Sequence, residues 1–370
     1  MRPRPAVPAQ LHRKTNLLAT GDGARALPSG PVAPGGQNWV VSGFDDIAVM
    51  GKAIEQMVAP QLKQWESEGR YLTTVLFQHK VFCKDCGNPA APPDRTLLLL
   101  HGFPESSFSF HKVVEGLAKL FDRVVLFDFP GYGLSDKPIA NYTYSLFEQA
   151  DVALQVWKER GVTGGHVLSH DMGDSVHTEL VARHVSGLLP AWLSAGFKSF
   201  TFTNGNMVLD LAQLRLGQKA LLGAAGPLFS RLFANWSAFN RTVQSAQGND
   251  RLTPEDAGLM WANVQLQHGH RMNHLLIQYL KDRKRFEKSR WLPSLSLVKE
   301  PVHICWGDAD AVSPAKVARH LKEHVCPRAR LTLMPGVGHF CQLSDPDMWL
   351  ASVAAFYNEE CGLGGRNRIK

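Results

Sequence analysis

Short runs of apolar residues recur along the chain, and the segments between them carry apolar residues at helical spacing. Runs rich in Val, Leu, Ile and Phe are typical of strands, and continuous runs indicate strands that are covered on both faces. Because strand and helix patterns alternate, the sequence favours an α/β fold with a mostly parallel sheet. The predicted strands are residues 71–77, 79–83, 96–100, 123–127, 166–170, 197–202, 301–306 and 330–334.

Helices are predicted before and between these strands. Apolar residues recur at helical spacing over residues 45–65, where Pro60 is expected to kink or break the helix. The helices predicted to flank the sheet are residues 106–120, 143–160, 174–187, 315–325 and 345–357.

The alternation stops between the strands at 197–202 and 301–306. Helical spacing replaces it, most clearly in GLMWANVQLQ and MNHLLIQYLK. A long helical segment between two strands of one sheet predicts an inserted cap. We therefore expect a flexible basic segment (1–40), a core with an N-terminal helix (41–204), a helical cap (205–295), the second part of the core (296–360) and a basic tail (361–370).

Charge is concentrated at the two ends of the chain. The formal net charge is +7, of which residues 1–40 contribute +4 and the tail GRNRIK contributes +3. The part between is therefore close to neutral, and no aromatic residues are interleaved with a basic stretch. The sequence does not favour nucleic-acid binding. It also contains no G-x-G-x-x-G after the first strand, so no dinucleotide cofactor is expected.

Six cysteines are spread along the chain, and Cys83 and Cys86 form a lone CKDC. Without a second pair at ligand spacing, we expect free thiols and no metal.

Residues 26–44 carry no charge but are rich in Gly and Pro, which indicates a linker and not a membrane helix. The arginine-bearing, acid-poor N-terminus fits either disorder or an organellar transit peptide. We expect a soluble protein that is cytoplasmic, or organellar if that segment is a transit peptide.

The stretch LSHDMGDS (168–175) joins a predicted strand to a predicted helix. A nucleophile on such a sharp turn needs small residues two positions away on either side, because the backbone is strained. Ser169 and Ser175 fail this test, whereas Asp171 lies between Ser169 and Gly173. Asp171 is therefore the candidate nucleophile, and capping of the following helix is the alternative role for this aspartate.

Three further turns follow predicted strands. The loop HGFP offers the backbone N–H of Phe103, which with the N–H of Met172 would form an oxyanion hole. CWGDAD offers Asp308 or Asp310 to orient a histidine, and GVGHF offers His339. The chain order of nucleophile, acid and histidine is that of α/β-hydrolases.

These motifs together resemble the epoxide hydrolase and haloalkane dehalogenase branch of the α/β-hydrolases. HGFPESSF, DFPGYGLSDKP, LSHDMGD, GDADAVSP and GVGHF carry the resemblance. It implies an eight-stranded, mostly parallel sheet with an inserted helical cap. The family's G-x-x-D pattern places the acid three residues after Gly307, at Asp310, with Asp308 as the alternative.

Within this branch the chain is most similar to the mesoderm-specific transcript family. SHDMGD, MWANVQLQ, LLIQYLKDRKRF and the spacing of WESEGRYLTTVLFQHKVF carry that likeness. Members usually begin with an apolar membrane segment that this sequence does not show, so we do not expect membrane attachment.

An aspartate nucleophile implies attack on an sp³ carbon and a covalent alkyl ester. Dehalogenases typically have residues with a side-chain N–H donor at the positions that correspond to Phe103 and Met172. Neither Phe103 nor Met172 has such a donor, so the resemblance favours a small apolar epoxide as substrate over a haloalkane. Epoxide hydrolases use two cap tyrosines as ring-opening acids, and only Tyr279 matches one of them. The alternatives are a dehalogenase-like or other hydrolase, and a ligand-binding or scaffolding protein with little turnover. No cofactor or metal is implied, and the sequence does not fix the oligomeric state.

Overall fold

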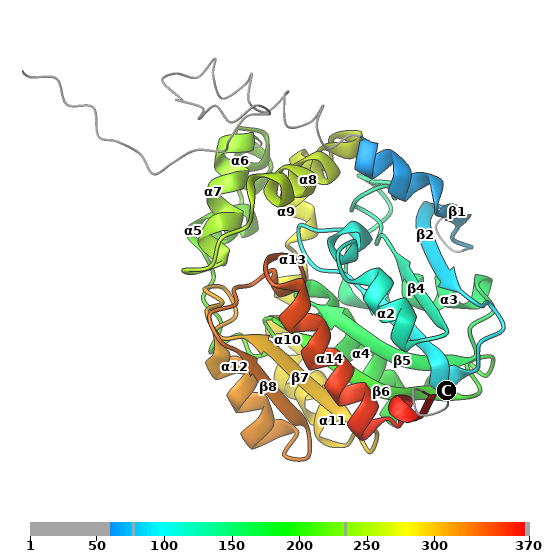
Figure 1. The fold of residues 1–370 in the computed structure, drawn as a ribbon. Coiled ribbons are helices and arrows are strands. Elements are labelled where there is room, and N and C mark those ends of the chain that lie inside the picture. The colour runs from blue at the N-terminus through cyan, green and yellow to red at the C-terminus, as the bar shows by residue number, and fades with distance from the viewer. Residues whose placement is uncertain (1–59, 76–77, 233–234, 367–370) are drawn as a thin grey trace, which may run out of the picture. The chain divides into compact units, whose positions relative to one another are not determined.

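A computed structural model describes residues 60–75, 78–232 and 235–366, and Figure 1 shows its fold. Eight strands form one sheet in the order β1-β2-β4-β3-β5-β6-β7-β8. The strands from β3 to β8 are parallel to one another, and β2 is antiparallel to both β1 and β4. The predicted α/β class and mostly parallel eight-stranded sheet are confirmed.

All eight predicted strands are present; three of them, at 96–100, 123–127 and 330–334, have the predicted bounds, and the other five have shifted ends. The structure has β1 shorter and β2 longer than predicted, and residues 76–77 lie outside the described part of the chain. The strands are β1 (Arg70–Thr73), β2 (Lys80–Gly87), β3 (Thr96–Leu100), β4 (Arg123–Phe127), β5 (Gly164–His170), β6 (Gly196–Thr203), β7 (Val302–Gly307) and β8 (Arg330–Met334).

The continuous apolar strands supply two cores at once. Successive side chains of a strand point to opposite faces of the sheet. In β3, Leu98 and Leu100 join one hydrophobic cluster, whereas Leu97 and Leu99 join the other. This double burial is the physical reason that β3 is apolar at every one of these positions.

Helices cover both faces of the sheet (Figure 1). The cluster with Leu98 also holds buried residues of α3 (Leu146–Glu159), α4 (Met172–Val185), α11 (Leu292–Ser296) and α12 (Ala315–His320). The cluster with Leu97 includes α2 (Val114–Leu120) and α14 (Pro346–Glu360). Five short helical segments complete the core: η1 (Pro93–Arg95), η2 (Ser107–Phe110), η5 (Leu321–Val325), α13 (Cys341–Ser344) and η6 (Leu363–Arg366).

Two predicted helices are each split in the structure. The segment 106–120 forms η2 and then α2, and the segment 315–325 forms α12 followed by the π-type turn η5. Of the predicted helix 45–65, residues 60–65 are helical and the helix continues to 67, while residues 45–59 lie outside the described part. The segment 1–40 also lies outside it.

Helices fill the segment between β6 and β7, and its described residues contain no strand. Its last elements, η4 and α11, pack on α4 of the core, whereas the earlier ones pack mainly on one another. The clear helical pattern MNHLLIQYLK is interrupted after α9 and resumes in α10. The elements are α5 (Leu216–Leu222), α6 (Gly226–Leu232), α7 (Trp236–Ala246), α8 (Pro254–Gln265), η3 (Leu266–Met272), α9 (Asn273–Leu276), α10 (Tyr279–Phe286) and η4 (Glu287–Trp291).

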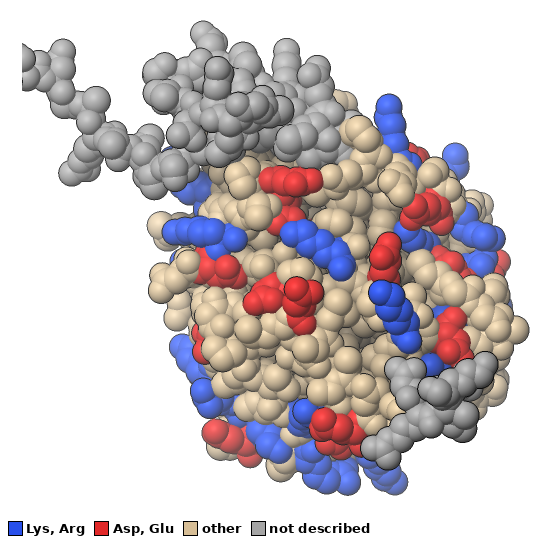
Figure 2. All heavy atoms as spheres, viewed as in Figure 1, with Lys and Arg blue, Asp and Glu red and all other residues tan. Residues whose placement is uncertain are grey.

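The surface shown in Figure 2 mixes Lys and Arg with Asp and Glu over the described residues. This agrees with the near-neutral charge of the middle of the chain. Within the described residues, no helix is long and apolar enough to cross a membrane.

Candidate active site

Asp171 occupies a strained turn between β5 and α4. Its φ of 49° and ψ of −113° lie outside the regions that side-chain-bearing residues favour. The N–H of Asp171 donates to the carbonyl of Thr203 at 3.0 Å, which ties the turn to the end of β6. A Cβ on Gly173 would lie 2.6 Å from the carbonyl oxygens of Leu100 and His101. The small residue after the aspartate is therefore needed for helix α4 to approach β3.

The carboxylate of Asp171 meets the loop after β3. Oδ2 of Asp171 accepts a hydrogen bond from the backbone N–H of Phe103 at 2.9 Å. Gly102 makes this approach possible, since a Cβ there would lie 2.7 Å from the Cβ of Asp171. Met172 begins α4, and among the described residues its N–H makes no hydrogen bond to this carboxylate. Of the two predicted oxyanion donors, Phe103 thus contacts Asp171 in this structure.

His339 lies between two carboxylates. Its Nδ1 is 2.8 Å from Oδ2 of Asp310, and its Nε2 is 3.5 Å from Oδ1 of Asp171. None of the three side chains is more than 4% exposed. The structure thus brings together the three residues that the sequence nominated from three separate turns.

The two candidate acids have different partners. Oδ1 of Asp310 accepts the N–H groups of Val312 and Ser313 at 2.7 and 2.9 Å, and its Oδ2 also accepts from Asn204 at 2.7 Å. Asp308 is exposed and accepts the N–H of Gly336 at 2.7 Å. Asp310 therefore contacts His339 and is rigidly held, and Asp308 ties the β7 turn to the turn that follows β8.

Charge balance in this buried group favours an ionised pair. Burial opposes the charged form of His339, but the Asp310 and Asp171 carboxylates raise its pKa well above the ordinary value. Burial likewise opposes ionisation of Asp171. Its contacts with His339, the charge of His170 and the N–H of Phe103 nevertheless hold the pKa of Asp171 below the ordinary value. The carboxylate of Asp171 is thus ionised at neutral pH.

Two tyrosines, one predicted and one missed, flank Phe103. The ring of Tyr279, at the start of α10, lies 6.4 Å from the ring of Phe103, and that of Tyr132 lies 6.5 Å from it. Burial and the charge of Asp171 raise the pKa of both phenols well above the ordinary value. Among the described residues, neither hydroxyl hydrogen-bonds to a protein group, whereas those of Tyr142 and Tyr144 do.

The position of Tyr132 near the site could have been predicted from the sequence. It follows β4, and β4 and β3 are parallel neighbours, so the loops after both strands meet at one edge of the sheet. The motif DFPGYGLSDKP therefore offers a phenol at that edge, outside the cap.

A second buried histidine lies behind the candidate nucleophile. Nδ1 of His170 is 2.8 Å from Oε1 of Glu105, and its Nε2 is 2.9 Å from the carbonyl oxygen of His339. Burial opposes protonation, but the Glu105 charge raises the pKa of His170. The pair connects the HGFPES loop to the loop that holds His339, and its side chains are fully buried.

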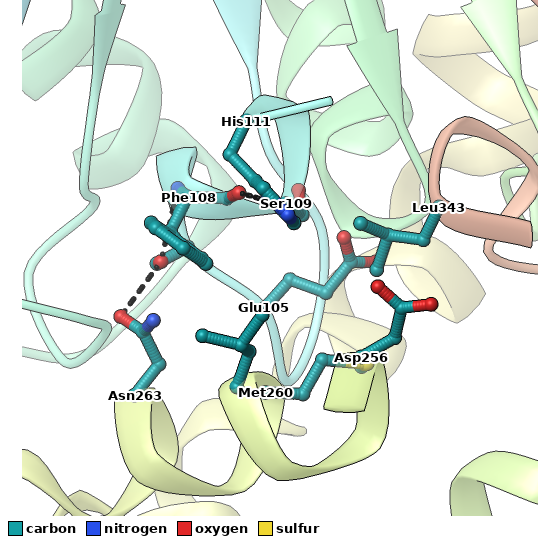
Figure 3. A pocket seen from close by; sticks show the side chains of 10 residues that line it. Glu105, Phe108, Ser109, His111, Asp256, Met260, Asn263 and Leu343 are labelled. Atoms are coloured by element: carbon teal, nitrogen blue, oxygen red, sulfur yellow. Dashed lines mark hydrogen bonds between the residues drawn. The ribbon is translucent and has the colours of Figure 1, made fainter. Parts of the chain in front are cut away.

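Glu105 also lines a small cavity between the core and cap helix α8, shown in Figure 3. The cavity measures about 10 Å³, close to the smallest space that one water molecule needs. Ser106 donates to Asn263 of α8 at 3.0 Å beside it. Lys112 reaches the carboxylate of Asp256 on the same helix at 2.7 Å. These polar contacts fix α8 against the loop that carries Phe103.

The remaining polar residues of LSHDMGDS form a separate buried cluster. Oγ of Ser169 donates to Asp174 at 2.6 Å and lies 2.8 Å from Nδ1 of His177. Burial raises the pKa of Asp174 well above, and lowers that of His177 well below, the ordinary values, so both are neutral. All three side chains are wholly buried. A serine, a histidine and an acid in contact here make a structural network beneath the turn.

Across the described residues, no group of three or more His, Cys, Asp or Glu side chains is arranged to hold a metal ion. The cysteines at 83 and 86 are both free thiols there.

The sheet, the strained strand-to-helix turn and the histidine after the last strand define an α/β-hydrolase. The family described as alpha/beta hydrolase fold matches residues 95–346 of this chain, and the chain belongs to that family. The predicted resemblance to mesoderm-specific transcript proteins is also confirmed. The human homolog of that protein is 32% identical over 311 residues, which cover 81% of this chain and 89% of the relative.

Other relatives have sequence identities above and below that value. A protein named putative hydrolase LipZ from Mycobacterium tuberculosis is 36% identical over 293 residues, covering 78% of this chain and 96% of the relative. Epoxide hydrolase 2 of Caenorhabditis elegans is 26% identical, covering 71% and 74%. Among solved structures, an alpha/beta hydrolase fold protein from Burkholderia ambifaria has a TM-score of 0.61 at 22% identity, covering 77% of this chain and 96% of that one.

Proposed function

We propose that this α/β-hydrolase hydrolyses epoxides to diols through a covalent ester of Asp171. One observation carries the proposal: Oδ2 of Asp171 accepts the N–H of Phe103, while Oδ1 faces Nε2 of His339 at 3.5 Å. One carboxylate oxygen thus rests in an oxyanion site, and the other is left for attack. Similarity to a named epoxide hydrolase supports the reaction class.

In the first step, Oδ1 of Asp171 attacks a ring carbon and the carbon–oxygen bond of the epoxide breaks. A phenol donates its proton to the leaving oxygen and is left as a phenolate, and the alkyl group is bound to Asp171 as an ester. We assign the donor role to Tyr279, with Tyr132 as the second phenol. Both have a raised pKa and a hydroxyl that the protein leaves free to donate.

In the second step, His339 first gives its resting proton to the phenolate and then removes a proton from water, and the water oxygen attacks the carbonyl carbon of the ester. The oxyanion that forms on Oδ2 is stabilised by the N–H of Phe103 and, we propose, by that of Met172. Each such donor is typically worth about 3 kcal/mol. Collapse releases the diol, which takes the remaining water proton, restores the Asp171 carboxylate and leaves His339 protonated as in the resting protein.

Ester formation itself prepares His339 for this role. Two carboxylates raise the pKa of His339 in the resting protein. Alkylation neutralises Asp171, so one of the two charges disappears and the imidazole gives up its proton more readily. Asp310 remains in contact with Nδ1 and keeps the ring oriented.

The test is intact-protein mass spectrometry of His339→Gln after incubation with a panel of aryl and alkyl epoxides. Loss of the base stalls the second step, so we expect a mass increase equal to one epoxide. Asp171→Ala/His339→Gln is the matched control and should gain no mass.

Other outcomes would replace the proposal. Adducts formed only with haloalkanes would assign a dehalogenase-like reaction, although Phe103 and Met172 offer no side-chain N–H to a halide. No adduct with either panel would indicate a ligand-binding protein with little turnover.

A further inference from the structure

The outer helices of the cap expose a cluster of leucines. Leu216 of α5 is 84% exposed, and Leu228 and Leu232 of α6 are 60% and 63% exposed. Figure 1 shows α5 and α6 at the edge of the cap that is remote from the sheet. Of the eight large apolar side chains exposed among the described residues, these three lie within two adjacent helices. Exposed apolar side chains that gather in this way mark an interaction surface.

The sequence of α6 places these leucines on one side of the helix. Gly226 and Ser230, four residues apart, are buried against α9, where the N–H of His274 donates to Oγ of Ser230 at 3.1 Å. Leu228 and Leu232 are also four residues apart, and they lie on the opposite side of the helix. The leucines are thus turned away from the protein by the same geometry that packs α6 on α9.

The chain segment that carries these leucines has charges of one sign only. From residue 211 to residue 249 the sequence contains no Asp or Glu, but it contains four basic residues. Lys219 of α5 and Arg231 of α6 are exposed beside the leucines. Helices that rest on a membrane surface combine exposed apolar side chains with Lys and Arg, because the leucines enter the interface and the cations meet anionic lipid headgroups.

We propose that α5 and α6 dock the protein on an anionic lipid surface. Leu216, Leu228 and Leu232 enter the boundary between headgroups and acyl chains, and Lys219 and Arg231 contact the phosphates. This is peripheral binding, consistent with the lack of a spanning helix in the described residues. The proposal does not depend on the reaction assigned to Asp171.

Vesicle co-sedimentation of the full chain tests the surface. The probes are vesicles of phosphatidylcholine alone and of phosphatidylcholine with phosphatidylglycerol. We expect binding to the anionic vesicles that weakens as salt is added. Leu228→Glu/Leu232→Glu should weaken it about tenfold or more per leucine, and Lys219→Glu/Arg231→Glu about fivefold per charge.

The matched control is Leu188→Glu/Leu297→Glu, because Leu188 and Leu297 are 63% and 65% exposed but lie outside the cap helices. It should bind vesicles as the wild type does. Circular dichroism of all variants separates lost binding from lost folding. Absence of wild-type binding, or equal binding by Leu228→Glu/Leu232→Glu, overturns the proposal. Self-association of the wild type that this variant abolishes, seen by sedimentation velocity, would instead assign the face to a second copy of the chain.

Discussion

Nε2 of His339 lies 3.5 Å from Oδ1 of Asp171, and the other oxygen of that carboxylate accepts the N–H of Phe103. The two oxygens therefore have different surroundings before any substrate arrives. One is held by a neutral donor from the loop after β3, and the other faces a cation that Asp310 supports from behind. In the proposed reaction, this asymmetry separates the oxygen that attacks from the one that carries the developing charge.

Asp310→Asn should slow hydrolysis of the ester far more than its formation. The substituted amide would keep the shape of the side chain but lose the charge that orients and stabilises the protonated imidazole. In serine hydrolases the same change costs about 10⁴-fold in rate. Single-turnover kinetics, with the alkyl-enzyme followed by rapid quench and mass spectrometry, separates the two steps.

Asp308→Asn is the matched control for that change. Asp308 is exposed and contacts only the N–H of Gly336 among the hydrogen bonds of the described residues, so the single-turnover rates should stay close to the wild type. Equal losses in the two variants would contradict the placement of Asp310 as the supporting acid.

Tyr279→Phe and Tyr132→Phe should each slow formation of the alkyl-enzyme. A positioned acid typically contributes about 10²–10⁴-fold to the rate. The measurement is the burst rate of alkylation in a His339→Gln background, where the second step is absent. If Tyr279 alone protonates the leaving oxygen, only its variant will be slow. A rate unchanged in both variants would argue against ring opening by a phenol.

Gly173→Ala should destabilise the protein by about 1–3 kcal/mol, because its Cβ would lie 2.6 Å from two carbonyl oxygens of the neighbouring chain segment. Gly217→Ala is the control: a Cβ there meets no atom within 4 Å. Alanine in helix α5 should be neutral or stabilising by up to about 1 kcal/mol. Urea denaturation of both variants gives the comparison, and similar losses at the two sites would contradict the close packing of the turn.

The sequence was sufficient for the fold because the decisive signals are local. β3 is apolar from Leu97 to Leu100 because these residues pack into two cores, and this pattern can be recognised in the sequence of the strand itself. The turn at Asp171 could also be predicted, because its strained backbone requires small residues two positions before and after the aspartate. The helical spacing of MNHLLIQYLK predicts one helix, whereas the structure has α9 and α10. Helical spacing does not show where the backbone bends between them.

The sequence predicts less of the site where the site depends on contacts between residues that are far apart in the chain. Asp308 and Asp310 lie in one turn, and only the fold shows which carboxylate reaches His339. Tyr132 and the pair of His170 with Glu105 were missed for the same reason. Tyr132 and Glu105 come close to this site only because β3, β4 and β5 end at one edge of the sheet.

Asp171→Asn should lower the pKa of His339. Two carboxylates raise that pKa in the resting protein, and the substitution removes the charge of one. The raised pKa means that this interaction stabilises the fold fully below the unfolded-state pKa of about 6.5 and is lost as pH rises through the folded-state value. In Asp171→Asn the loss should therefore be complete at lower pH. Histidine ring resonances followed by NMR against pH give the pKa directly, and thermal unfolding at each pH gives the stability. Asp308→Asn should leave both curves unchanged. A His339 pKa that stays the same in Asp171→Asn would mean that Asp310 alone holds the proton, and that ester formation does not release it.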